Sequence, residues 1–150
     1  MNKIIHALGL LAIIIIFISF DYQKKKNNYS LTVEVSDLRN SKGVVQFALY
    51  NTPDAFPDED YNKYYLKLTA EIENRFSTVT FENLPPGKYA INILHDEDVN
   101  GKIKKGLVLP KEGIGFSNYE SIGLFNKPNF SDADFELKKD TSIRVHIIYM

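Results

Sequence analysis

The chain has 150 residues, 44% hydrophobic and 13% aromatic, which is enough for one ordinary core and too little for a second domain of typical size. Its 18 lysine and arginine residues nearly balance 19 aspartate and glutamate residues, so the net charge of -1 indicates neither a nucleic-acid-binding surface nor an acidic tail. Cysteine is absent, which excludes disulfides, thiolate metal sites and cysteine nucleophiles.

A hydrophobic leader is predicted at residues 1–20. Lys3 precedes an almost wholly apolar run from Ile4 to Phe20, which is typical of an export signal. No pair of small residues marks a cleavage site, and a run of about 17 residues is near the lower limit for crossing a bilayer. A cleaved signal peptide and an N-terminal membrane anchor therefore both remain open. The three lysines at 24–26 oppose translocation of the chain that follows.

A polar linker is predicted at residues 21–29, ahead of a single domain at 30–150. Apolar and polar residues alternate from Leu31 to Val35 and again from Gly43 to Tyr50, which is the period of a half-buried strand. Turn-forming residues separate the two runs. We therefore expect these two strands to form a hairpin.

The middle of the domain predicts a loop and three more strands. The loop at 51–60 is rich in proline and aspartate, and Phe56 within it is expected to pack back onto the domain. Segment 61–73 fits a strand or a short helix, and the alternation of its apolar residues favours the strand. Strands are also predicted at 76–81 and 88–95, joined by a tight proline-glycine turn.

A long irregular excursion is predicted from Asp96 to Pro128, with its glycine-rich stretch at 113–118 forming a turn. Closing strands are expected at 134–137 and 141–149. About seven short strands and no convincing helix indicate an all-β fold, a single Ig-like antiparallel β-sandwich with one long irregular loop.

Several motifs in order resemble one known family. The stretch F-E-N-L-P-P-G-K-Y at 81–89 is similar to the L-x-P-G-x-Y turn of transthyretin-like and carboxypeptidase-regulatory-like sandwiches. It is followed by A-I-N-I-L-H-D-E-D-V-N-G at 90–101, K-E-G-I-G-F-S-N at 111–118 and P-N-F-S-D-A-D-F at 128–135. Together they resemble the uncharacterised exported bacterial family catalogued as domain of unknown function 2141. The resemblance implies export and a prealbumin-like β-sandwich, and it carries no established activity.

One group of residues suggests a metal site. Asp96, Asp98 and Asn100, followed by Gly101, match the first half of the D-x-[DN]-x-[DN]-G calcium loop, in which alternate side chains supply oxygen ligands and the glycine permits the sharp turn. The bidentate glutamate at position twelve is missing, so an EF-hand is not expected. A calcium site completed by Glu112 or by a loop carbonyl remains one interpretation.

The other interpretation is a tight polar turn whose aspartate and asparagine side chains bond to their own backbone. Lys104 and Lys105 favour it, because positive charges weaken a cation site by repulsion.

Two classes of function follow. The first is an exported, non-catalytic cell-envelope module, periplasmic, secreted or anchored at the outer face of a membrane. Its excursion, ordered by calcium in one interpretation, would present a binding surface to a glycan, a protein or an envelope component. No nucleic-acid partner is expected. The protein would contact a membrane only through its N-terminal segment, if that segment is not cleaved. The alternative is a hydrolase that uses Ser117, with His95, or the carboxylates of Glu112 and Asp132 in the 96–132 region.

Overall fold

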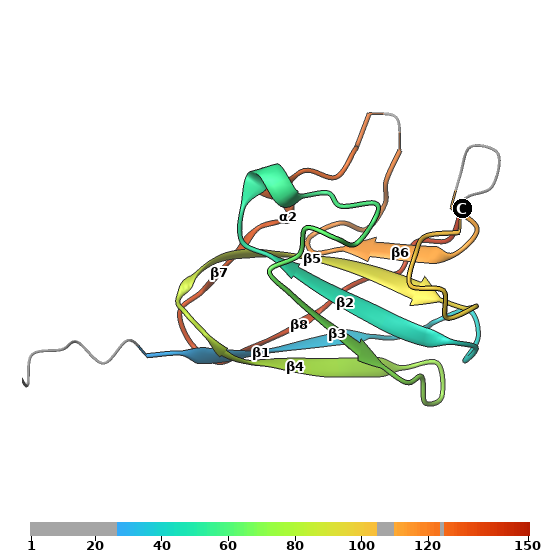
Figure 1. Ribbon diagram of the computed structural model, residues 1–150, viewed down its shortest axis with the longest axis horizontal. Helices are drawn as coiled ribbons and strands as arrows, with labels where there is room; N and C mark the ends of the chain where they lie inside the picture. Colours follow the sequence, from blue (N-terminus) through green and yellow to red (C-terminus); the bar gives the residue numbers. More distant parts are fainter. Residues whose placement is uncertain (1–26, 105–109, 124) are drawn as a thin grey trace, which may run out of the picture.

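The computed structural model describes residues 27–104, 110–123 and 125–150, so the predicted leader and most of the predicted linker lie outside the described residues. Two β-sheets pack face to face as a sandwich (Figure 1). The strands are β1 (Tyr29–Val35), β2 (Val44–Tyr50), β3 (Leu66–Ala70), β4 (Ser77–Leu84), β5 (Gly87–Asp96), β6 (Gly113–Phe116), β7 (Phe135–Leu137) and β8 (Thr141–Arg144). The predicted all-β sandwich is confirmed, with eight strands in the described residues.

The two sheets differ in size and direction of pairing. The smaller sheet has the order β4-β1-β8, in which β1 pairs antiparallel with β4 and parallel with β8. The larger sheet has the order β3-β2-β5-β6 and is antiparallel, and β7 pairs with the beginning of β5. The proline-glycine turn that ends at Gly87 carries the chain from β4 in one sheet to β5 in the other.

The expected hairpin of the first two strands is wrong. β1 belongs to the smaller sheet, whereas β2 pairs with β3 and β5 in the larger one. The connection between them crosses the sandwich, and its Leu38 is fully buried in the core. Alternation in the sequence indicates a half-buried strand but not its partner, and a connection of this length can either fold back or cross.

Apolar side chains from the inner faces of both sheets form the main core. A second apolar cluster covers the outer face of the larger sheet, so β2 and β5 are buried on both sides. Phe56 belongs to this second cluster and lies edge-on to three rings: Tyr50 at 5.4 Å, Phe116 at 5.7 Å and Phe130 at 6.2 Å between centroids. The predicted packing of Phe56 is confirmed.

The predicted excursion is more ordered than expected. Residues 113–116 of its glycine-rich stretch form strand β6, which pairs with β5, and only residues 117–118 form a turn. A β-carbon at Gly115 would lie 2.6 Å from the backbone oxygen of His146, and one at Gly113 would lie 2.4 Å from the ring of Tyr149. Glycine is needed at these positions because the C-terminal segment passes directly over β6 and leaves no space for a side chain. Turn geometry is not the reason.

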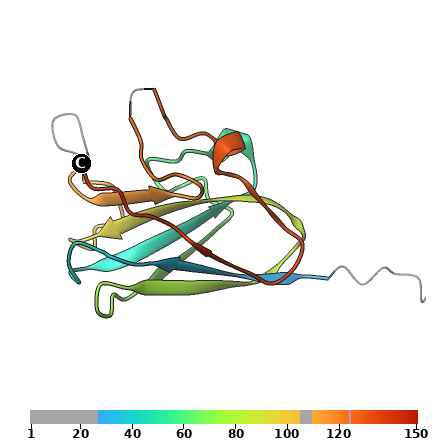
Figure 2. The same ribbon diagram turned by 180° about the vertical axis from the view of Figure 1, so that it is seen from behind.

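The C-terminal segment crosses from one sheet to the other (Figure 2). The predicted closing strand ends early, at Arg144, after which the chain reaches β6 and Ile148 exchanges two backbone hydrogen bonds with Ile114. A four-residue helix, α2 (Phe130–Ala133), was not predicted. Within residues 27–104, 110–123 and 125–150, no helix is long and apolar enough to cross a membrane.

Candidate metal centre

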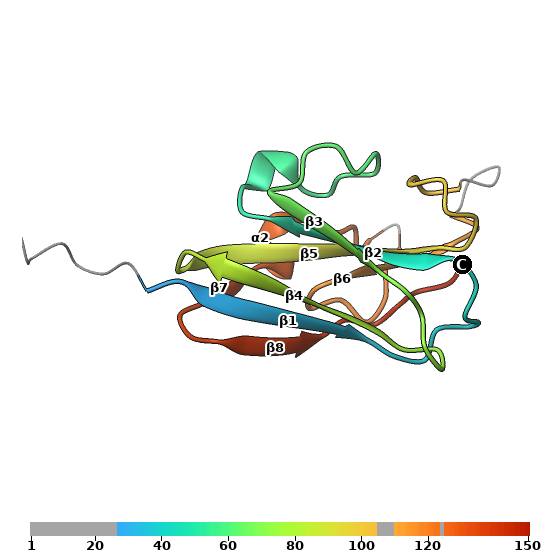
Figure 3. The same cartoon turned by 60° about the horizontal axis from the view of Figure 1, so that its bottom comes forward.

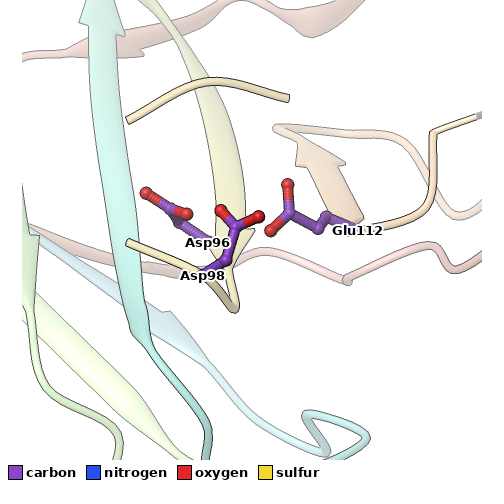
Figure 4. A group of neighbouring side chains, drawn as sticks. All are labelled: Asp96, Asp98 and Glu112. Carbon is purple, nitrogen blue, oxygen red and sulfur yellow. The ribbon is translucent and has the colours of Figure 1, made fainter. Parts of the chain in front are cut away.

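Three predicted site residues meet where β5 ends and β6 begins. Asp96 is the last residue of β5, Asp98 follows it, and Glu112 directly precedes β6. β5 and β6 are antiparallel neighbours, with His95 opposite Gly113, so these ends lie side by side. One oxygen from each of the three carboxylates lies within 4.8 Å of the other two (Figure 4).

Asp96 is almost completely buried and closes the loop that follows it. Its Oδ1 accepts the backbone N–H of Asn100 at 3.1 Å, and its Oδ2 accepts that of Gly101 at 2.8 Å. Oδ2 also accepts the side-chain amide of Gln46 at 2.8 Å. Gln46 lies on β2, far away in the sequence, and only the pairing of β2 with β5 brings it to this site.

Glu112 is also buried and joins the two ends of the same loop. Its Oε1 accepts the backbone N–H of Glu97 at 3.0 Å, and its Oε2 accepts that of Lys104 at 2.8 Å. A single carboxylate thus holds the segment 97–104 against the start of β6.

Asn100 does not join the carboxylates through its side chain. Its Oδ1 accepts the backbone N–H of Lys102 at 2.8 Å, an Asx turn of the kind expected from the polar-turn interpretation. Val99 and Gly101 on either side have left-handed backbone conformations, with φ of 56° and 79°. The structure therefore combines features of both interpretations: a polar turn at Asn100 beside converging carboxylates.

The local charge is negative. The ammonium of Lys104 lies 2.8 Å from Asp98 Oδ2, and this hydrogen bond raises the pKa of Lys104. Neither Asp96 nor Glu112 has an ion-pair partner among the described residues, and both carboxylates are satisfied only by uncharged N–H donors. Among the described residues, three carboxylates and one ammonium leave two negative charges, and buried charge is costly unless it is compensated.

The carboxylates retain lone pairs that could coordinate a cation. A carboxylate has about four lone-pair sites. From the described residues, Asp96 Oδ1 and each Glu112 oxygen accept one N–H, which leaves a second lone pair on each. A cation among the three carboxylates could use these remaining lone pairs and would compete with the ammonium of Lys104 for Asp98.

The residues of the alternative hydrolase hypothesis are bonded elsewhere. The buried hydroxyl of Ser117 donates to the backbone oxygen of Ala133 at 2.7 Å and accepts the N–H of Ile91 at 2.9 Å. The buried ring of His95 contacts the hydroxyl of Tyr149 at 2.7 Å and the backbone oxygen of Lys42 at 3.0 Å. In the described part of the chain no hydrogen bond joins Ser117 to His95.

Asp132 also lies apart from the carboxylate cluster. It is exposed within α2, where its Oδ2 accepts the side-chain amide of Asn129 at 2.7 Å. Asp132 is absent from the group that Glu112 forms with Asp96 and Asp98 within the described residues.

An ion pair beside the cluster was not predicted. Arg39 binds Glu97 through two hydrogen bonds of 2.6 and 2.8 Å and donates a third to the backbone oxygen of Lys111 at 2.9 Å. The Arg39 hydrogen bonds, assisted by Asn40, lower the pKa of Glu97 to about 2. Arg39 thereby connects the segment between β1 and β2 to both ends of the segment between β5 and β6.

A cavity of about 690 Å³ lies on the outer face of the larger sheet. Ligand sites commonly have volumes of roughly 300–1,000 Å³ and mainly apolar walls. Most of the lining residues come from the excursion, and the others include the buried polar side chains of Asp58 and Asn92. The lining residues are Pro57, Asp58, Glu59, Asn92, Ile103, Pro110, Ile114, Phe116, Ile122, Gly123, Lys127, Pro128 and Met150. Glu112 holds the segment 97–104, and Ile103 of that segment lines the cavity, so the candidate metal centre and the cavity are connected.

Comparison with protein families gives a match. The family described as "Uncharacterized protein conserved in bacteria (DUF2141)" matches residues 33–144, which contain most of both sheets and all three clustered carboxylates. Comparison with curated proteins and with solved structures gives no match.

Proposed function

The chain belongs to the DUF2141 family of bacterial proteins, and we propose that it is an exported, non-catalytic cell-envelope module whose excursion at 96–128 binds calcium and presents a binding surface. The observation that carries the proposal is the convergence of Asp96, Asp98 and Glu112 from two adjacent strand ends. Export is supported by the hydrophobic run from Ile4 to Phe20.

The chemistry of the cluster favours calcium among the common metal ions. All the candidate ligands are oxygens, whereas zinc, copper, iron and nickel favour imidazole or thiolate. The nearby imidazole of His95 is buried and contacts Tyr149 and Lys42 through its two nitrogens. Calcium accepts six to eight oxygens in irregular geometry, whereas magnesium demands a near-ideal octahedron. With the ammonium of Lys104 displaced, the three carboxylates would form a strongly negative oxygen site, which suits a divalent cation.

The ion would couple the metal centre to the binding surface. Asp96 and Asp98 precede the excursion's first cavity residue, Ile103, and Glu112 lies between Pro110 and Ile114. A cation held by all three carboxylates would fix these parts of the wall relative to the sheet. The binding partner would then occupy the cavity. The partner proposed is a glycan, a protein or an envelope component.

Calorimetric titration with calcium tests the proposal in three variants. Asp98→Asn removes a charged ligand and should weaken calcium binding by on the order of tenfold. Lys104→Met removes the competing ammonium and should tighten it. Lys102→Met, in the same loop, serves as the matched control, because the Lys102 ammonium forms no ion pair among the described residues.

We expect Lys104→Met to bind calcium more tightly than wild type and the control, and Asp98→Asn to bind it more weakly than both. The calcium site is rejected if wild-type protein gives no binding heat with millimolar calcium, or if Asp98→Asn binds as tightly as wild type.

A further inference from the structure

The edge of the larger sheet at β3 exposes an apolar surface. β3 is the last strand in the order β3-β2-β5-β6, and its outer edge has no strand partner among the described residues. β3 and β4 converge at the link that joins them and part toward the start of β3 (Figure 3). Leu66 and Leu68 on this open flank are 39% and 37% exposed, and Tyr64 and Tyr65 just before them are 38% and 43% exposed.

An exposed strand edge with apolar side chains can accept another strand. We propose that β3 pairs antiparallel with β3 of a second copy of this chain, which makes a two-fold symmetric dimer with a continuous sheet. The inference goes beyond the proposed calcium-dependent binding function and does not rest on it.

The charges on β3 and the residues after it specify one register. Antiparallel self-pairing centred on Thr69 places Lys67 opposite Glu71 of the second copy, and the symmetry repeats this pair. Opposite charges directly across an antiparallel pair stabilise it. In the same register Leu66 lies opposite Ile72 and Leu68 opposite Ala70, so the other face is apolar throughout.

Three other registers are less favourable. Centring on Lys67 or on Glu71 would place like charges opposite each other. Centring on Ala70 would require Glu73, but the backbone N–H and C=O of Glu73 already exchange hydrogen bonds with Phe76 in the tight link to β4. Among these arrangements, the register on Thr69 alone combines opposite charges with apolar contact and leaves the hydrogen bonds between Glu73 and Phe76 intact.

Sedimentation analysis of the purified protein, expressed as the full chain, tests this arrangement. Wild type should dimerise with rising concentration. Lys67→Glu and Glu71→Lys should each weaken the dimer by on the order of tenfold, because each creates two like-charge pairs. Lys139→Glu, the same charge change at an exposed site outside β3, serves as the control and should leave the dimer unchanged.

Restoration gives the sharper test. The double variant Lys67→Glu/Glu71→Lys should recover wild-type dimerisation, and an equimolar mixture of the two single variants should form a heterodimer stronger than either homodimer. This recovery also shows that the single variants are folded. The inference is overturned if wild type stays monomeric up to its solubility limit, if the single variants dimerise like wild type, or if neither the double variant nor the mixture recovers.

Discussion

Glu97 shows how the fold changes the acidity of a single residue. Its hydrogen bonds to Arg39 lower its pKa from 4.5 to about 2. A carboxylate with a lowered pKa stabilises the folded state above its ordinary pKa, and this contribution is lost as the pH falls from 4.5 toward 2. Glu97→Gln should therefore lower the free energy of unfolding near neutral pH, and the difference from wild type should shrink over this acidic range in urea titrations.

Arg39→Gln provides the matched background for this prediction. Without the guanidinium, the effect of Glu97→Gln should be smaller and depend less on pH, because only the hydrogen bond from Asn40 remains. A pH-dependent difference of the same size in both backgrounds would show that Arg39 is not its cause.

At the scale of secondary-structure elements, β6 depends on its glycines. The C-terminal segment lies over β6, and a β-carbon at Gly115 would be 2.6 Å from the backbone oxygen of His146. Gly115→Ala should therefore destabilise the protein by about 1–3 kcal/mol, the usual cost of overpacking. Gly123→Ala is the matched control, because no atom lies within 4 Å of its β-carbon position. Equal denaturation midpoints for the two variants would contradict this account of β6.

Elements differ in how much of them can be predicted from the sequence. The alternation in β1, β2 and β5 is local, and it predicts strands that the structure contains. Strand pairing is not local, so the partner of β1 was predicted wrongly. The glycines of β6 were interpreted as a turn, because only the path of the distant C-terminal segment explains them.

The candidate metal centre shows the same limit. Asp96 and Asp98 belong to the partial calcium-loop motif, whereas Glu112 lies outside it and entered the prediction only as a residue that could complete the site. The side chain of Asn100 lies elsewhere because a backbone donor two residues along satisfies its oxygen. Gln46 and the pair of Arg39 with Glu97 come from distant segments, and no local pattern indicates them.

In the molecule as a whole, the sandwich carries an excursion that the carboxylates of Asp96 and Glu112 hold where it leaves β5 and where it returns to β6. The two sheets bury one core between them, and a second cluster attaches the excursion to the outer face of the larger sheet. The proposed ion would act where the excursion leaves β5 and returns to β6. Binding only to this folded arrangement must stabilise the entire domain, because unfolding would release the ion.

The thermal midpoint of unfolding with and without calcium tests this central claim most directly. Saturation at about one hundred times the dissociation constant adds about 2.7 kcal/mol of stability. For a domain of this size, this amount raises the midpoint by roughly 5–15 °C. The account predicts such a rise for wild type and a smaller one for Asp98→Asn. A wild-type midpoint that does not move in millimolar calcium would contradict it.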